Sequence, residues 1–128
     1  MDAWDFEHFA DYLADAERSV FLTALDGKEI AGYAVAHIRQ ARAELDSIAV
    51  GPAHRKKHIA LQLMRRILGT LRRRGFESVF LSVRADNAAA IRLYQKFGFE
   101  RFRSIECYYE DGAPALRMKL KLIHRSTR

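Results

Sequence analysis

The sequence predicts an α/β fold of the mixed (α+β) type, in which helices flank a central sheet with both parallel and antiparallel strands. The first observation is a helical pattern over residues 57–74, where apolar residues recur at intervals of four. These residues are Ile59, Leu63, Ile67 and Leu71. The second is a strand pattern on either side of this helix, at 43–50 and 77–84. A strand, a helix and a strand in this order imply a right-handed parallel crossover.

The N-terminal part is expected to form a helix followed by an antiparallel hairpin. Residues 3–18 have their apolar residues on one helical face and acids in the early turns. Asp26-Gly27 is a hairpin turn signal, and it separates strand patterns at 19–25 and 29–38.

The C-terminal part is expected to form a short helix and a second hairpin. Asp86 or Asn87 is a suitable cap for a helix that runs to about residue 96. Strand patterns at 99–109 and 115–123 then enclose a turn. Together with the crossover, these elements predict a mixed sheet with helices on its faces.

Composition excludes several classes of protein. The chain has 128 residues, of which 49% are hydrophobic and 30% charged, so we expect one folded domain over 1–128 rather than a disordered chain. The single cysteine, Cys107, excludes an intramolecular disulfide and a zinc site built from cysteines. His37, His54 and His124 have no paired spacing with carboxylates, so no metal is expected. No apolar run approaches the ~20 residues of a membrane span, and no signal peptide is visible, which predicts a soluble cytoplasmic protein.

Charge is unevenly distributed along the chain. Residues 1–46 contain ten acidic and four basic residues, whereas 47–128 contain six acidic and eighteen basic residues. The basic part indicates an anionic partner, which could be a nucleic acid, an acidic protein or a phosphate-bearing ligand. Charge alone does not decide between them.

The loop before the long helix contains three consecutive cations, Arg55, Lys56 and Lys57. A helix N-terminus presents unpaired N–H groups and a partial positive charge, so cations there are unfavourable unless an anion binds. A strand, a loop and a helix N-terminus with added cations indicate a phosphate site. The alternative is a solvated basic loop.

Three segments, in family order, resemble the GCN5-related N-acetyltransferases (GNAT). The first is Ile48-Ala49-Val50 followed by Arg55-x-x-His58-x-Ala60, which is similar to the family's motif A, Q/R-x-x-G-x-G/A. The second runs over 87–99 and is similar to N-x-x-A-x-x-L-Y-x-x-x-G-F. The third, over 108–118, resembles the C-terminal hairpin of the subgroup that acetylates protein N-termini, including ribosomal-protein alanine acetyltransferases.

This resemblance implies an acetyl-CoA-dependent N-acetyltransferase on a GNAT-like, N-terminally shortened fold. Acetyl-CoA would lie between the splayed strands 43–50 and 77–84. The backbone of the first strand would bind the acetyl group and the pantetheine amides, and residues 55–60 would bind the pyrophosphate. Asn87 and Tyr94, from the second motif, would flank the pantetheine and sulfur end. The implied cofactor-binding residues are Ile48, Ala49, Val50, Arg55, Lys56, Lys57, His58, Ile59, Ala60, Asn87 and Tyr94.

The resemblance also implies catalytic roles. Tyr94 matches the family's usual general acid, which protonates the departing thiolate. Glu44 stands where histone-type members carry a catalytic glutamate, and it is our candidate base, acting through a water. The ribosomal-protein type instead uses a carboxylate on the next strand, where this chain has Ser82.

Strict alternation along 43–50 predicts that Glu44 shares one side of the strand with Asp46, Ile48 and Val50. The acidic first 46 residues would then border the acceptor side. That arrangement favours a cationic amine, such as a protein or peptide N-terminal α-amine.

His58 is the clearest departure from the family pattern, because it replaces the first glycine of motif A. An alternative hypothesis is therefore a non-catalytic module that binds acyl-CoA or docks to a partner. A basic nucleic-acid-binding module is a third and more distant alternative. A homodimer also stays open, since a short N-terminal element could leave an apolar patch for a second copy to cover.

Overall fold

The computed structural model describes residues 18–27, 29–52 and 58–122. The helix expected at 3–18 therefore lies almost wholly outside the described residues, as do Arg55, Lys56 and Lys57. The elements described are β1 Ser19–Asp26, β2 Glu29–Arg39, β3 Arg42–Val50, α2 Ile59–Arg73, β4 Ser78–Arg84, α3 Ala88–Lys96, β5 Glu100–Ile105 and β6 Ala115–Lys121.

Within these residues the predicted elements are confirmed, with one clear difference in length. The strand expected over 99–109 ends at Ile105. Cys107 has a left-handed φ of 52°, and the backbone N–H groups of Tyr108 and Tyr109 both donate to the Ala113 carbonyl. The chain therefore turns into a loop before the apolar pattern ends.

The mixed sheet is confirmed, and its six strands have the order β1-β2-β3-β4-β6-β5. The β1–β2, β2–β3 and β5–β6 neighbours are antiparallel. β3 and β4 are the parallel pair that the crossover through α2 requires. Because β6 lies between β4 and β5, it pairs with both.

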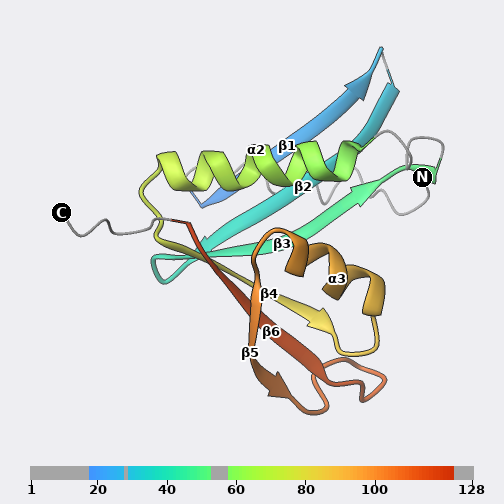
Figure 1. Ribbon diagram of the computed structural model, residues 1–128, viewed down its shortest axis with the longest axis vertical. Helices are drawn as coiled ribbons and strands as arrows, with labels where there is room; N and C mark the ends of the chain where they lie inside the picture. Colours follow the sequence, from blue (N-terminus) through green and yellow to red (C-terminus); the bar gives the residue numbers. More distant parts are fainter. Residues whose placement is uncertain (1–17, 28, 53–57, 123–128) are drawn as a thin grey trace.

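The parallel pair opens along its length. Only Ala43 with Val79 and Glu44 with Phe80 are in register. Beyond these pairs β3 and β4 diverge, with α3 in front of the opening (Figure 1). This confirms the splayed strands that the family resemblance implies, and it leaves the β4-facing edge of β3 without a strand partner over residues 45–50 among those described.

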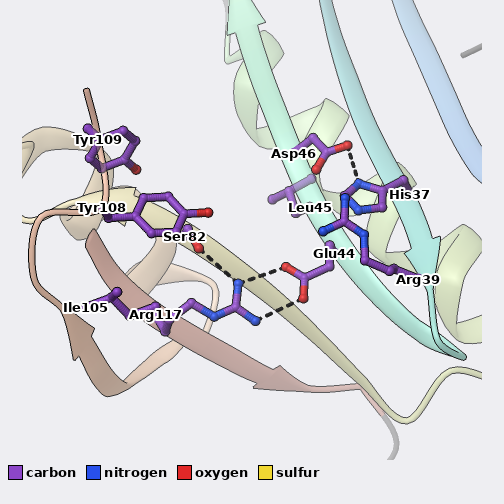
Figure 2. Close-up of a pocket in the computed structure, with 10 residues that line it drawn as sticks. All are labelled: His37, Arg39, Glu44, Leu45, Asp46, Ser82, Ile105, Tyr108, Tyr109 and Arg117. Carbon is purple, nitrogen blue, oxygen red and sulfur yellow. Dashed lines mark hydrogen bonds and ion pairs between the residues drawn. The ribbon is translucent and has the colours of Figure 1, made fainter. Parts of the chain in front are cut away.

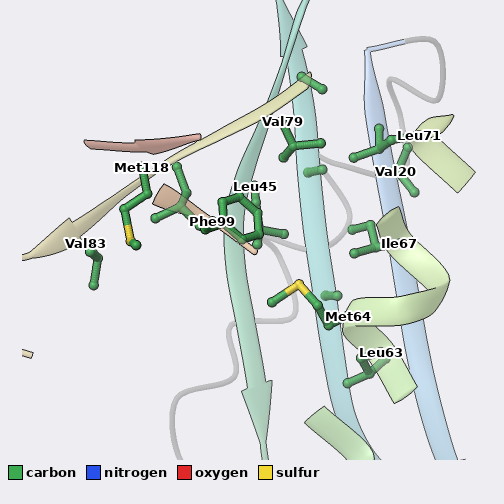
Figure 3. Close-up of a cluster of buried hydrophobic side chains, with 14 of the residues drawn as sticks. Val20, Leu45, Leu63, Met64, Ile67, Leu71, Val79, Val83, Phe99 and Met118 are labelled. Carbon is green, nitrogen blue, oxygen red and sulfur yellow. The ribbon is translucent and has the colours of Figure 1, made fainter. Parts of the chain in front are cut away.

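The hydrophobic core lies between the sheet and α2 (Figure 3), and partly buried residues of α3 pack against it. α2 contributes Leu63, Met64, Ile67 and Leu71, each at most 3% exposed. Fully burying a side chain of this kind contributes roughly 1.5–3 kcal/mol, so these four hold the helix against β1, β2 and β3.

A β-bulge between β2 and β3 changes the direction of the side chains. Val35 pairs with Ser47, but Ala36 pairs with Leu45, so Asp46 is an extra residue on β3. A bulge of this kind leaves the extra residue unpaired and interrupts the alternation of faces.

The bulge makes the strict alternation predicted for this strand wrong. Leu45, Ile48 and Val50 all belong to the core on the side of α2. Glu44 lies on the opposite face from Ile48 and Val50, because the inserted residue shifts the phase by one position.

Candidate functional site

A cavity of about 450 Å³ opens on the face of the sheet opposite α2, where β3 begins to leave β4. Its lining comes from β2, β3, β4, β6, the end of β5 and the loop that follows it (Figure 2). The lining residues are His37, Arg39, Glu44, Leu45, Asp46, Ser82, Ile105, Tyr108, Tyr109 and Arg117.

Glu44 is held at the base of this cavity by Arg117. The Nη1 and Nη2 groups of the guanidinium donate to Oε1 and Oε2, each at 2.9 Å. Nη1 also donates to Ser82 Oγ at 3.0 Å. Glu44 and Arg117 retain 17% and 15% of their side-chain exposure, so the pair is mostly buried.

The ion pair sets the charge state of Glu44. Burial alone would raise the pKa of its carboxyl, but the hydrogen bonds and positive charge of Arg117, with smaller help from His37 and Arg42, bring the pKa below its ordinary value. A carboxylate whose two oxygens both accept from a guanidinium is a weak base. The assignment of Glu44 as the base therefore stays a prediction that this geometry does not favour.

A second pair lies beside Glu44 in the cavity. The Nδ1 atom of His37 lies 2.5 Å from Oδ2 of Asp46, and these side chains are only 20% and 23% exposed. His37 stands directly opposite Glu44 in the β2–β3 register, and the bulge places Asp46 beside it.

The sequence reading missed this pair, because it found no paired spacing between His37 and a carboxylate. The two residues are nine positions apart, and only the β2–β3 turn and the bulge bring them together. Arg117 was missed for a similar reason, since its contact with Glu44 depends on β6 lying beside β4.

A loop over 106–114 carries two tyrosines to the opposite wall of the cavity. The Tyr108 and Tyr109 rings meet edge to face at 4.9 Å between centroids. Arg84, at the end of β4, holds this loop through Asp111, with Nη2 to Oδ2 at 2.7 Å. Its guanidinium also lies 5.1 Å from the centre of the Tyr109 ring, so one arginine positions the wall.

Tyr94 lies on α3, with its ring packed edge to face on Phe99 at 5.8 Å. Burial raises the pKa of its phenol, and the nearby phenol of Tyr109 raises it further. A raised pKa keeps the proton on the oxygen throughout the physiological range, as a proton donor requires. Tyr94 does not line the cavity.

Asn87 is confirmed as the residue that caps α3. Its side-chain Oδ1 accepts from the backbone N–H of Ala90 at 3.1 Å. The cap sets the start of the helix that carries Tyr94, so Asn87 positions the phenol as well as standing at the implied cofactor side.

His58 occupies the cap of α2 in the left-handed conformation, with φ 58°. It thus adopts the backbone that glycine favours and that other residues enter at a cost of roughly 1–2 kcal/mol. The His58 side chain makes no capping hydrogen bond, and no acid lies in the first turn of the helix. The helix's first-turn N–H groups, which include those of Ile59 and Ala60, fit an anionic ligand such as a pyrophosphate.

The described residues contain neither a cluster of metal-binding side chains nor a membrane-spanning helix. No cluster of three or more histidine, cysteine, aspartate or glutamate side chains is placed to hold a metal ion within residues 18–27, 29–52 and 58–122. Within the same ranges, no helix has the length and apolar character needed to cross a membrane.

Comparison with known proteins gives a consistent result. The family model described as "Acetyltransferase (GNAT) family" matches residues 1–99. An N-alpha-acetyltransferase of Sulfurisphaera tokodaii is 29% identical over 132 residues, covering 93% of this chain and 78% of the relative. The [ribosomal protein bS18]-alanine N-acetyltransferase of Escherichia coli K12 is 30% identical over 106 residues, covering 83% of this chain and 70% of the relative.

The fold agrees with these sequence matches. The crystal structure of the ribosomal-protein-S18-alanine N-acetyltransferase from Escherichia coli superposes with a TM-score of 0.82 at 29% identity. The match covers 96% of this chain and 80% of that one.

Proposed function

We propose that this chain, which belongs to the acetyltransferase (GNAT) family, transfers the acetyl group of acetyl-CoA to the α-amine at the N-terminus of a protein or peptide. It acts as one catalytic domain in a cytoplasmic setting. The acceptor is assigned by two kinds of support: the names of the relatives, which are N-terminal acetyltransferases, and the pair of tyrosines on the loop that walls the cavity.

The observation that carries the proposal is the opening between β3 and β4 with a polar cavity beside it. The unpaired edge of β3 offers the backbone of Ile48, Ala49 and Val50 to the amides of the acetyl donor. The start of α2 offers N–H groups to its phosphates. The β3 edge and the start of α2 belong to the same strand–helix crossover, so one long molecule such as acetyl-CoA can reach both.

The reaction has the usual requirements of acyl transfer. The amine nitrogen attacks the thioester carbon, a C–N bond forms, the C–S bond breaks and the amine loses a proton. A protein α-amine has a pKa of ~7.7–8.0, so much of it is already neutral near pH 8. Tyr94 keeps its phenol proton and supplies it to the thiolate. Glu44 and Arg117 keep the cavity wall in place through their ion pair.

The proposal is tested by measuring release of CoA thiol with a panel of peptides that differ in their first residue. We expect transfer to some members, and mass spectrometry should locate the acetyl group on the α-amine. The matched control is each reactive peptide with its α-amine already blocked and a free lysine retained. Calorimetry with acetyl-CoA measures donor binding separately.

Two results would overturn the proposal in different ways. Transfer to lysine in the blocked peptides, at the rate seen with free α-amines, would refute the acceptor assignment. Tight binding of acetyl-CoA without thiol release from any peptide or amine would favour the non-catalytic acyl-CoA-binding module, which the substitution of His58 for glycine first suggested.

A further inference from the structure

We propose that His37, oriented by Asp46, is the group that takes the proton from the acceptor amine. This inference rests on the proposed function and names the base of that same site. Neither residue belongs to the three motifs that carry the family resemblance. The geometry of the cavity points to this pair in four steps.

The first step is the tautomer of His37. A carboxylate accepts hydrogen bonds and donates none. Because Nδ1 lies 2.5 Å from Oδ2 of Asp46, the proton of the neutral ring resides on Nδ1. The lone pair is then on Nε2, which is the atom that can take a proton. A carboxylate in this position also stabilises the imidazolium that forms.

The second step is the state of Nε2. This atom is buried and has no hydrogen-bond partner among the described residues. Leaving a buried polar atom unpaired costs about 1–3 kcal/mol, and such atoms call for an explanation in a native structure. His37 itself lines the cavity, so a small side-chain movement that uncovers Nε2 would let a water or an amine supply the missing partner.

The third step is the position of the pair in the cavity. His37 and Asp46 form one wall of it, and the two tyrosines form the wall opposite (Figure 2). The cavity begins where β3 leaves β4, which is where the acetyl donor is proposed to lie. An amine held in the cavity is thus beside His37 and next to the opening in which the donor is proposed to lie.

The fourth step compares His37 with the other ionisable groups of the cavity. Glu44 faces His37 across the strands, but both of its oxygens accept from Arg117. Ser82 has no basic group. The charged and titratable side chains that share the cavity with the pair are Arg39 on β2, Glu44 on β3, Arg117 on β6 and Tyr108 and Tyr109 on the loop. Among these side chains, only His37 has a ring nitrogen without a hydrogen-bond partner among the described residues.

The step balances as follows. The α-ammonium gives one proton to Nε2, directly or through one water, and becomes a neutral amine. The amine nitrogen forms the new bond to the acetyl carbon, and the sulfur leaves with the electron pair of the C–S bond and takes the phenol proton of Tyr94. The nitrogen loses its second proton as the amide forms, and that proton restores the phenol. His37 is then an imidazolium beside the Asp46 carboxylate, and it returns its proton to solvent after the product leaves.

The test compares wild type with His37→Gln, using as probe a peptide that wild type acetylates and varying the pH between roughly 6 and 9. A general base contributes about 10²–10⁴-fold, so we expect kcat/KM at neutral pH to fall by about 100-fold or more. The acid limb of the pH profile should disappear, and the affinity for acetyl-CoA should stay unchanged. In His37→Ala, added imidazole should restore part of the rate.

Asp46→Asn tests the orienting role. An amide can donate to Nδ1, which moves the ring proton to Nε2 and removes the basic lone pair. We expect a loss in kcat with little change in KM for acetyl-CoA. Arg72→Gln is the matched control, because Arg72 is exposed on α2, away from the cavity. The pH profile of this variant should match that of wild type.

The outcomes separate this inference from the proposed function. If wild type acetylates the peptide while His37→Gln keeps its rate and acid limb, the inference is refuted and the function stands. If Glu44→Gln loses the acid limb and His37→Gln does not, Glu44 is the base. A loss of rate in His37→Ala that imidazole does not rescue, with an unchanged pH profile, would assign His37 a structural role only. A wild type without transfer refutes the function itself.

Discussion

Replacing Arg117 by methionine should destabilise the protein, because it leaves the Glu44 carboxylate mostly buried without its partner. The substitution keeps much of the apolar stem and removes three hydrogen bonds of 2.9, 2.9 and 3.0 Å. Breaking a buried ion pair on one side costs about 3–5 kcal/mol. Glu44 retains 17% exposure, so we expect the lower end, a loss of about 3 kcal/mol.

The double variant Glu44→Leu with Arg117→Met should recover most of this loss. Two apolar side chains need no partner, and apolar replacement of a buried pair is often neutral or stabilising. Urea unfolding at neutral pH measures the free energies of unfolding of wild type, Arg117→Met and the double variant. An equal dependence of this free energy on urea concentration shows that the three proteins expose similar surface on unfolding. Arg84→Met is the matched control, because its ion pair with Asp111 is exposed at 38% and 58% and its loss should be much smaller.

The pH dependence gives an independent check of the same reasoning. In wild type the pKa of Glu44 is lowered on folding, so its contribution to stability is present above the unfolded-state pKa and is lost as the pH falls through the folded-state value. In Arg117→Met only the smaller charges of His37 and Arg42 oppose burial, so the pKa of Glu44 rises above its wild-type value and protonation at low pH relieves the unpaired charge. The difference in free energy of unfolding between wild type and Arg117→Met should therefore shrink below about pH 4. A loss under about 1 kcal/mol at neutral pH, typical of exposed pairs, would refute the argument.

Three further predictions concern the site. Tyr94→Phe should lower kcat by about 100-fold or more while leaving the KM for acetyl-CoA unchanged, as steady-state thiol release would show; an unchanged kcat would remove Tyr94 from the mechanism. His58→Gly should leave the free energy of unfolding within about 1 kcal/mol of wild type, because relief of the left-handed strain offsets the greater freedom of the unfolded chain; chemical denaturation measures this, and a large loss would contradict it. Arg84→Ala should raise the KM for the acceptor peptide without changing the Kd for acetyl-CoA, because it releases the loop that carries Tyr109; equal changes in both constants would argue against a role in acceptor binding.

The local elements could be predicted from the sequence because their signals are short-range. The apolar stripe of α2, the Asp26-Gly27 turn and the Asn87 cap each depend on residues within a few positions of one another. The family motifs added the splayed crossover, which the β3–β4 register confirms. They also named Tyr94, whose raised pKa is consistent with its predicted role.

The contents of the cavity followed from long-range contacts that no local pattern reports. Glu44 and Arg117 are 73 positions apart, and they meet only because β6 lies against β4. The strand 43–50 reads as a regular alternation, yet the bulge at Asp46 reverses its phase. A bulge is stabilised by pairing with the neighbouring strand, so the strand's own residues do not reveal it.

The sequence by itself thus determined the type and order of the elements and the family, since periodicity, caps and motif spacing are properties of neighbouring residues. Only the tertiary structure decided how the acceptor side is built. There an arginine neutralises the expected base, and an inserted aspartate orients a histidine. The physical reason is that strand order and register, rather than spacing along the chain, determine which side chains share a low-dielectric cavity and so which of them can exchange a proton.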